Sequence, residues 1–339
     1  MPNQEDVGMT VPKGLALMIT ILASLTVIAC KGSDTDKGLL DQATEGASPI
    51  APTNNNEPPS QPLFTTPTRS NSLATSLPVT IRDSRGLDIQ LNEFPERIIA
   101  YDSAVVEILF AIGEGQRIIG THDFVTYPPE TEDIPKLGSA FSINIEQIVA
   151  LKPDLVFFFS EGFVDNVEKA GITVLYRKSL ESNFREVAND IRMWGRITGA
   201  NERAEQVATE FENRVELIQS TIGNVSMGQK VFHDTGDLWT PGSNTLVGEV
   251  LTFLKLHNIA HDIDGYQQFS PEVIVDRNPE IIITSNRDRF VHQDAFANVN
   301  AIKNNRVYTP NSDGLSVASP RFIEAVEELA RLVYPETFR

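Results

Sequence analysis

The chain has 339 residues, 41% of them hydrophobic, and a formal net charge of −18. That length and apolar content suffice for two domains with cores of their own, whereas so acidic a chain argues against nucleic acid as a partner. The single cysteine, Cys30, excludes an intrachain disulfide framework.

The N-terminal segment has the features of an export signal. An apolar run extends from residue 15 to residue 29, which is shorter than the ~20 residues of a transmembrane helix but matches the core of a signal peptide. The run ends in Val27-Ile28-Ala29-Cys30, which resembles the lipobox at which bacterial lipoproteins are cleaved and lipidated. We therefore expect residues 1–29 to be a lipoprotein signal peptide and Cys30 to carry a lipid anchor. A plain signal peptide with an incidental cysteine is the alternative.

Residues 30–78 have the composition of a tether. More than half of the residues that follow Cys30 in this segment are Pro, Asn, Ser, Thr or Gly. Apolar residues are too sparse there to offset the entropy cost of folding. The sequence therefore predicts a disordered spacer that holds a folded body away from a membrane; a cleaved pro-segment is the alternative.

The first half of the folded body alternates strands with helices. Apolar, β-branched runs predict strands, and segments of helical period separate them. The predicted strands are residues 79–81, 97–101, 117–120, 154–159 and 172–176. Ser103 is the expected N-cap of a helix over residues 104–112. This alternation is typical of a mainly parallel sheet covered by helices, and it predicts an α/β lobe over residues 79–200.

A long helix is expected to join this lobe to a second one. Apolar residues recur every three or four positions between Ala204 and Ile222, which gives one buried stripe, and Gly223 is the expected C-terminal cap. The remaining predicted elements include strands at residues 230–233 and 306–308 and helices at 246–256 and 320–332. The sequence thus predicts a bridging helix over residues 201–223 and a second α/β lobe over 224–339.

One short pattern occurs twice in the chain with the same spacing. Glu146-Gln147-Ile148 and Glu272-Val273-Ile274 are each followed, after four residues, by a proline, an acid and an apolar strand. Each copy predicts a short helix that ends before the proline, and then a strand inside a sheet. We infer two lobes of similar build, with a glutamate at a matched position on each.

With these elements placed, the chain resembles the family of cobalamin- and ferric-siderophore-binding proteins, the extracytoplasmic receptors of ABC importers. The resemblance covers about residues 79–335. It rests on Tyr127-Pro128-Pro129-Glu130, on residues 144–156, and on Ser312-Asp313 with Ala318-Ser319-Pro320-Arg321. It implies two Rossmann-like α/β lobes with mainly parallel sheets, joined by one long helix, with the ligand in a cleft between them. It further implies a monomeric binding protein, not an enzyme, with no cofactor of its own.

The resemblance also implies partners. In the cobalamin-binding members a glutamate on each lobe docks onto arginines of the membrane permease, and the matching positions are Glu146 and Glu272. Two carboxylates at a fixed separation would orient a basic partner; ordinary acids in the first turn of a helix, where the helix dipole favours them, are the alternative. We expect an extracytoplasmic protein, lipid-anchored to the outer face of the cytoplasmic membrane, that works with an ABC permease and its ATPase.

Aromatic side chains are expected to line the ligand site. Loops at the carboxyl ends of parallel strands form the sites of such folds. The positions that match aromatic cleft residues of the cobalamin binders are Tyr127, Ala140, Trp239 and Tyr266. Phe141 neighbours Ala140 and is expected to serve in its place. Such faces suit a large, flat, partly apolar ligand; packing in the core or at the rim is the alternative for each.

Polar residues bear on the choice of ligand. Asp313 matches a polar cleft residue of the cobalamin binders, but Val317 stands where those proteins have an arginine. Arg287 and Arg289 would suit an anionic ferric siderophore, unless they are solvated loop charges. We expect cobalamin or another corrinoid as the transported ligand, with a ferric siderophore or haem as the alternative.

The sequence does not indicate a metalloenzyme or a nucleotide enzyme. His257 and His261 have helical spacing but lack the glutamate of a zinc peptidase, so we interpret them as surface residues. His122 and His233 end strands near the expected site, where a haem or metal ligand is the alternative. Residues 113–115 (Gly-Glu-Gly) follow a helix rather than a strand, which a dinucleotide loop must follow.

Overall fold

The computed structural model describes residues 77–179, 183–226 and 228–338. Cys30, the predicted signal peptide and nearly all of the predicted tether lie outside these residues. None of the helices in the described part of the chain combines the length and the hydropathy of a membrane span.

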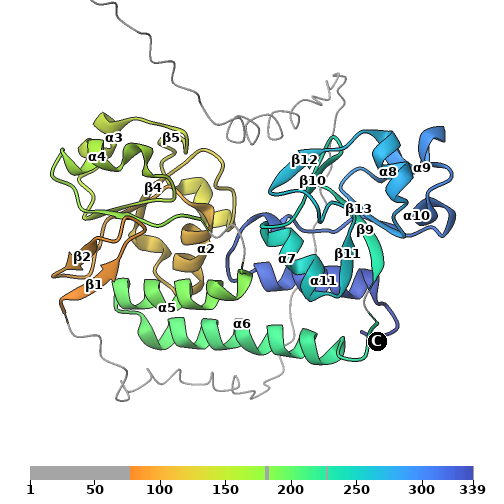
Figure 1. The fold of residues 1–339 in the computed structure, drawn as a ribbon. Helices are drawn as coiled ribbons and strands as arrows, with labels where there is room; N and C mark the ends of the chain where they lie inside the picture. The colour runs from red at the N-terminus through yellow and green to blue at the C-terminus, as the bar shows by residue number, and fades with distance from the viewer. Residues whose placement is uncertain (1–76, 180–182, 227, 339) are drawn as a thin grey trace, which may run out of the picture. The chain divides into compact units, whose positions relative to one another are not determined.

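The first parallel sheet has four strands in the order β4-β3-β7-β8 (Figure 1). These strands are β3 (Ile98–Ala100), β4 (Ile118–Thr121), β7 (Leu155–Phe158) and β8 (Val174–Tyr176). Every residue of β3, β7 and β8 is buried. Uninterrupted burial is expected of parallel strands that have helices on both faces.

The second parallel sheet repeats the arrangement of the first, in the order β11-β9-β13-β14. Its strands are β9 (Gln229–Asp234), β11 (Leu256–Asn258), β13 (Ile281–Thr284) and β14 (Val307–Tyr308). In both sheets the first strand along the chain lies between the second and the third. The predicted fold class, two α/β lobes with parallel central sheets, is confirmed. In such sheets ligands bind at the carboxyl ends of the strands, where the strand order reverses.

Helices and short antiparallel pairs complete the fold. The helices are α2 (Ser103–Ala111), α3 (Ile145–Ala150), α4 (Val164–Glu168), α5 (Val187–Thr198), α6 (Asn201–Thr221), α7 (Leu246–Phe253), α8 (Pro271–Arg277), α9 (Arg287–Val291), α10 (Asn300–Lys303) and α11 (Phe322–Val333). The antiparallel pairs are β1 (Val79–Arg82) with β2 (Asp88–Leu91), β5 (Gly138–Ser139) with β6 (Ser142–Ile143), and β10 (Trp239–Pro241) with β12 (Tyr266–Gln268). The 3₁₀ turns are η2 (Gly115–Arg117), η3 (Pro129–Asp133), η4 (Glu161–Phe163), η5 (Phe184–Glu186), η6 (Asp294–Phe296) and η7 (Gly314–Ser316).

Helix α6 packs against both α5 and α11, and Figure 1 shows α5 lying along it. Arg192 of α5 forms ion pairs with two glutamates of α6, and Arg214 of α6 pairs with Glu327 of α11 at 2.8 Å. A Cβ on Gly195 of α5 would lie 2.3 Å from the Cβ of Ala204 of α6, so this glycine permits the close approach of the two helices. The lobe boundaries at residues 200 and 223 stay a prediction.

The largest buried cluster runs through both lobes and along the inner stripe of α6. It includes Ile98 of β3, Trp194 of α5, Phe211 of α6, Val231 of β9 and Phe322 of α11. Two smaller clusters cover the other faces of the sheets. This burial confirms the predicted apolar stripe of α6.

Three predicted helix ends were wrong in detail. Asp102, rather than Ser103, caps α2, because its side chain accepts the N–H of Ala104. Helix α7 ends at Phe253, since the chain turns at Lys255 with φ 59°. The C-cap of α6 is Ile222, and Gly223 does not adopt the left-handed conformation expected of it.

Candidate solute site and matched glutamates

Glu146 and Glu272 occupy the same position in two matched helix–strand units. Each is the second residue of its helix, α3 or α8, and each is exposed. The two helices also end alike, because Lys152 (φ 48°) and Asn278 (φ 45°) are left-handed directly before the proline. The sequence repeat therefore corresponds to a repeat of the backbone. A hydrogen bond from Ser270 lowers the pKa of Glu272, which keeps that carboxylate ionised.

The acid after each proline has a structural role that the repeat did not reveal. Asp154 Oδ2 accepts the N–H groups of Glu96 and Arg97, both at 2.9 Å, just before β3. Glu280 Oε2 accepts the N–H of Lys230 at 2.9 Å in β9. In both lobes this carboxylate therefore ties the central strand of the sheet to its neighbour.

Trp239 and Tyr266 share one face of a two-stranded ribbon. They begin β10 and β12, which pair antiparallel with Pro241 opposite Tyr266. Side chains alternate along a strand, so Trp239 and Pro241 lie on one face and Tyr266 points to that same face. Tyr266 is 47% exposed, and Trp239 is half-buried. The predicted loop position of Trp239 was wrong, since the residue belongs to a strand.

A buried carboxylate fixes the turn that leads to Trp239. Asp234 Oδ1 accepts the N–H groups of Gly236 at 3.0 Å and Leu238 at 2.9 Å, and its Oδ2 accepts the hydroxyl of Thr284 at 2.7 Å. Burial raises the pKa of Asp234, and these hydrogen bonds oppose the rise. Both central residues of the turn have positive φ, and the N–H of Trp239 closes it onto the carbonyl of Gly236. This is the type I′ geometry of a tight hairpin.

Tyr127 and Asp313 are joined through Arg321, to which the sequence assigned no role. Tyr127 follows β4 and is 46% exposed. The Cζ atom of Arg321 lies 4.5 Å from the centroid of the Tyr127 ring, and its Nη1 lies 2.6 Å from Asp313 Oδ1. The structure therefore brings two of the predicted site residues together around one guanidinium.

Phe141 lies in the turn between β5 and β6. It is half-buried, and its ring packs edge-to-face on Phe159, with 5.9 Å between the centroids. Phe159 follows β7 directly, so Phe141 lies at the carboxyl edge of the first sheet. Its neighbour Ala140 is 5% exposed. Of this pair only Phe141 has a face available to a ligand.

His122 and His233, which lie at strand ends, are neutral but differ in the hydrogen bonds of their ring nitrogens. His122 Nδ1 accepts the N–H of Phe124 at 3.2 Å, so Nε2 carries the proton and donates to Ser103 Oγ at 3.3 Å. His233 Nδ1 is buried without a hydrogen-bond partner among the described residues. Burial lowers the pKa of both histidines to about 4. Among the described residues, His233 is therefore the one of the two that has a ring nitrogen without a hydrogen-bond partner.

His257 and His261 lie in β11 and the following turn rather than on a helix. Their rings are 4.6 Å apart and exposed, as predicted for surface residues. Within the described part of the chain, no group of three or more His, Cys, Asp or Glu side chains is placed to hold a metal ion.

Arg287 and Arg289 belong to helix α9, and each contacts a neighbouring side chain. Arg289 forms an ion pair with Asp237 at 2.5 Å, in the turn before Trp239, and Arg287 donates to Asn305 at 2.6 Å. They therefore lie on a helix rather than in a loop, and each has a side-chain partner.

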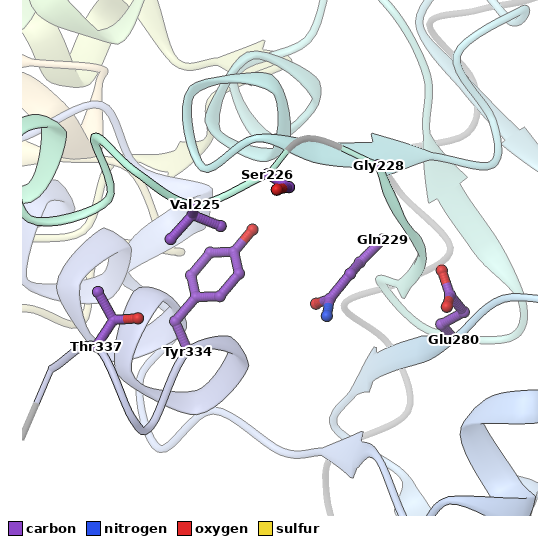
Figure 2. A pocket seen from close by; sticks show the side chains of 7 residues that line it. All are labelled: Val225, Ser226, Gly228, Gln229, Glu280, Tyr334 and Thr337. Atoms are coloured by element: carbon purple, nitrogen blue, oxygen red, sulfur yellow. The ribbon is translucent and has the colours of Figure 1, made fainter.

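A separate open pocket lies at the opposite edge of the second sheet (Figure 2). Its lining residues are Val225, Ser226, Gly228, Gln229, Glu280, Tyr334 and Thr337. Gln229 begins β9 and Glu280 directly precedes β13. The pocket therefore lies at the amino ends of the strands, away from the carboxyl ends where Thr284 and the Trp239 turn are found.

Comparison with known proteins decides the family. The family described as "Periplasmic binding protein" matches residues 98–313, which span both sheets. The chain belongs to this family. Its members bind solutes and are not enzymes. The predicted likeness to the solute-binding components of ABC transporters is thereby confirmed.

Three similar proteins illustrate the range of the family. The ABC transporter substrate-binding lipoprotein YvrC of Bacillus subtilis, itself uncharacterized, is 33% identical over 77% of this chain and 87% of its own length. A cobalamin-binding protein of Halobacterium salinarum is 27% identical over 78% of this chain and 76% of its own. The crystal structure of a possible iron-binding, periplasmic solute-binding protein of Staphylococcus epidermidis is 26% identical, with a TM-score of 0.61 over 71% of this chain and 100% of its own.

Proposed function

We propose that this protein captures cobalamin or another corrinoid outside the cytoplasm and delivers it to an ABC permease and its ATPase. The observation that carries the proposal is the shared face of Trp239 and Tyr266, both at least partly exposed on a ribbon beside the carboxyl ends of β9 and β13. Rigid aromatic faces bury a large ligand surface at low entropy cost. Tyr127 and Phe141 supply further exposed ring surface in the first lobe.

The ion pair of Arg289 supports a corrinoid over an anionic chelate. Of the two arginines that would attract a ferric siderophore, Arg289 pairs with the carboxylate of Asp237, whereas Arg287 donates to the neutral side chain of Asn305. The charged group among the proposed ligand contacts is the carboxylate of Asp313, whose side chain is 74% exposed and pairs with Arg321. The exposed oxygen of such a carboxylate can accept hydrogen bonds from the amide groups of a ligand.

Delivery rests on Glu146, Glu272 and Cys30. The two glutamates are exposed at equivalent positions of equivalent helices, as a two-sided contact with a basic permease surface requires. Cys30 would hold the protein at the membrane through its lipid, and residues 30–78 would serve as the tether.

Calorimetric titration of the full chain tests the ligand. Cyanocobalamin should bind saturably, and Trp239→Leu and Tyr266→Leu should each weaken binding about tenfold or more, since each removes a buried aromatic contact. Trp194→Phe is the matched control, because Trp194 is fully buried against Phe157 in the first lobe. Absence of cyanocobalamin binding by the wild type would refute the corrinoid proposal.

A ferric siderophore or haem is the second candidate. It is favoured by the similarity to the possible iron-binding protein of Staphylococcus epidermidis, since both cargoes contain iron, and by His233 Nδ1, which has no hydrogen-bond partner among the described residues. Haemin and a ferric hydroxamate belong in the same titration series. A Soret shift with haemin that His233→Ala abolishes would support haem as the cargo.

A further inference from the structure

Arg321 lies where residues from distant parts of the chain meet. It directly precedes α11, and its side chain is 15% exposed. Its Nε donates to Glu107 Oε2 at 2.8 Å, its Nη1 donates to Asp313 Oδ1 at 2.6 Å, and its Cζ stands 4.5 Å from the ring centroid of Tyr127. Tyr127 belongs to the first predicted lobe and Asp313 to the second. Arg321 therefore contacts one proposed ligand residue from each.

Glu107 is the buried partner of Arg321. It lies on α2, is 4% exposed, and also accepts the hydroxyl of the fully buried Ser319 at 2.5 Å. A buried carboxylate without such partners would be very costly. Burial raises the pKa of Glu107, and the bonds from Arg321 and Ser319 oppose the rise. Because Glu107 is buried and accepts both of these hydrogen bonds, it anchors the guanidinium of Arg321.

The planar guanidinium explains why this residue is an arginine. Its N–H groups donate to Glu107 and Asp313, while its Cζ lies over the ring of Tyr127, 4.5 Å from the centroid. In-plane hydrogen bonding combined with stacking on an aromatic ring is specific to arginine. Lysine offers a point charge without a face. Since Arg321 is itself largely covered, the surfaces that a solute can reach are those of Tyr127 and Asp313.

We propose that Arg321 is a positioning residue for solute binding: it holds Tyr127 and Asp313 at a fixed separation, so that the solute meets a preformed aromatic face beside a preformed carboxylate. This inference rests on the proposed function, because it takes Tyr127 and Asp313 as solute contacts. Contacts that are already ordered need no further ordering on binding, and affinity rises accordingly.

The first test separates positioning from stability. Arg321→Lys keeps the charge beside Glu107 but loses the stacked plane, so cyanocobalamin binding by the full chain should weaken roughly five- to thirtyfold in calorimetry, with a thermal midpoint close to that of the wild type. Arg214→Lys is the matched control, since Arg214 likewise pairs with two carboxylates, those of Glu324 and Glu327, and is 25% exposed. Unchanged affinity in Arg321→Lys, or an equal loss in Arg214→Lys, would overturn the inference.

A double-mutant cycle tests whether Arg321 acts through Tyr127. In a Tyr127→Leu background the ring that Arg321 holds is gone, so Arg321→Lys should cost clearly less affinity than it does in the wild type. If the fold loss of affinity in the double variant equals the product of the losses in the two single variants, the two residues act independently and the proposal is contradicted.

A measurement without ligand keeps this inference distinct from the proposed function. In the full chain labelled with ¹³C-tyrosine, the ring resonance of Tyr127, assigned with Tyr127→Phe, should shift and narrow in Arg321→Lys and stay unchanged in Arg214→Lys. If the wild type binds no ligand of the panel, the proposed function fails whatever the resonance does. An unshifted Tyr127 resonance in Arg321→Lys overturns the positioning role by itself.

Discussion

At the scale of single residues, a buried imidazole makes the stability depend on pH. Burial lowers the pKa of His122 from 6.5 to about 4, so between these values the unfolded chain binds more protons than the folded one. The stability that the neutral ring contributes is therefore lost as the pH falls through this window. His233 acts in the same direction, whereas Asp102, whose pKa burial raises to about 6, acts in the opposite direction.

His122→Asn isolates this contribution, because the asparagine oxygen can accept the N–H of Phe124 without titrating. Relative to this variant, the wild type should lose about 1–3 kcal/mol of unfolding free energy between pH 7 and pH 4. Urea unfolding of both proteins at several pH values gives the difference between their unfolding free energies. The other titrating residues, which both proteins contain, cancel in this difference. Parallel pH profiles would contradict the assigned burial.

Asp234 is predicted to hold Trp239 in place. Asp234→Ala removes the acceptor for two backbone N–H groups and one hydroxyl, so it should cost about 2–3 kcal/mol of stability and loosen the tryptophan. Asp234→Asn keeps the acceptor for both backbone groups and should remain near the wild type. Fluorescence anisotropy of Trp239 in a Trp194→Phe background, together with urea unfolding, measures both effects. Equal behaviour of the two variants would mean that the hydrogen bonds do not order the turn.

The roles of several residues around the candidate site could not be assigned from the sequence, for a physical reason. Arg321 stood in a motif that was recognised, but its partners Glu107 and Tyr127 are about 200 positions away in the chain. A signal existed for Glu107, since an acid inside the apolar run of α2 must find a partner when buried. That signal predicts the existence of a partner and not its identity.

At the scale of elements, the close packing of α5 on α6 depends on Gly195. Gly195→Ala would place a Cβ 2.3 Å from the Cβ of Ala204, so the helices would have to separate. We expect a loss of about 1–3 kcal/mol in unfolding free energy, as in other overpacked cores. Gly162→Ala is the control, because an added Cβ meets no atom within 4 Å there. Equal thermal unfolding temperatures for Gly195→Ala and Gly162→Ala would contradict this packing.

The elements most accessible to sequence analysis were those with local signals. The stripe of α6, the proline-terminated helices α3 and α8 and the buried strands all follow from short-range patterns. The β10–β12 ribbon was missed because its strands are three residues long and lie 24 residues apart, so their pairing leaves no local signal. This pairing is what places Trp239 and Tyr266 on one face.

At the scale of the whole molecule, the repeat gives both sheets the same strand order and places Glu146 and Glu272 at equivalent points. Each glutamate is exposed, so neither is needed for the core, and the proposed solute contacts lie on other elements. Capture and delivery should therefore be separable by mutation.

The most direct test of this account is uptake by cells that carry Glu146→Ala and Glu272→Ala together. Radiolabelled cobalamin uptake should be abolished, while the affinity of the purified full chain for cyanocobalamin stays at the wild-type value. Asp165→Ala with Asp288→Ala is the matched control, since these exposed acids also lie in the first turns of helices, α4 and α9, and should leave uptake intact. Normal uptake by the Glu146 and Glu272 variant, or a loss of affinity that explains its defect, would contradict the docking role.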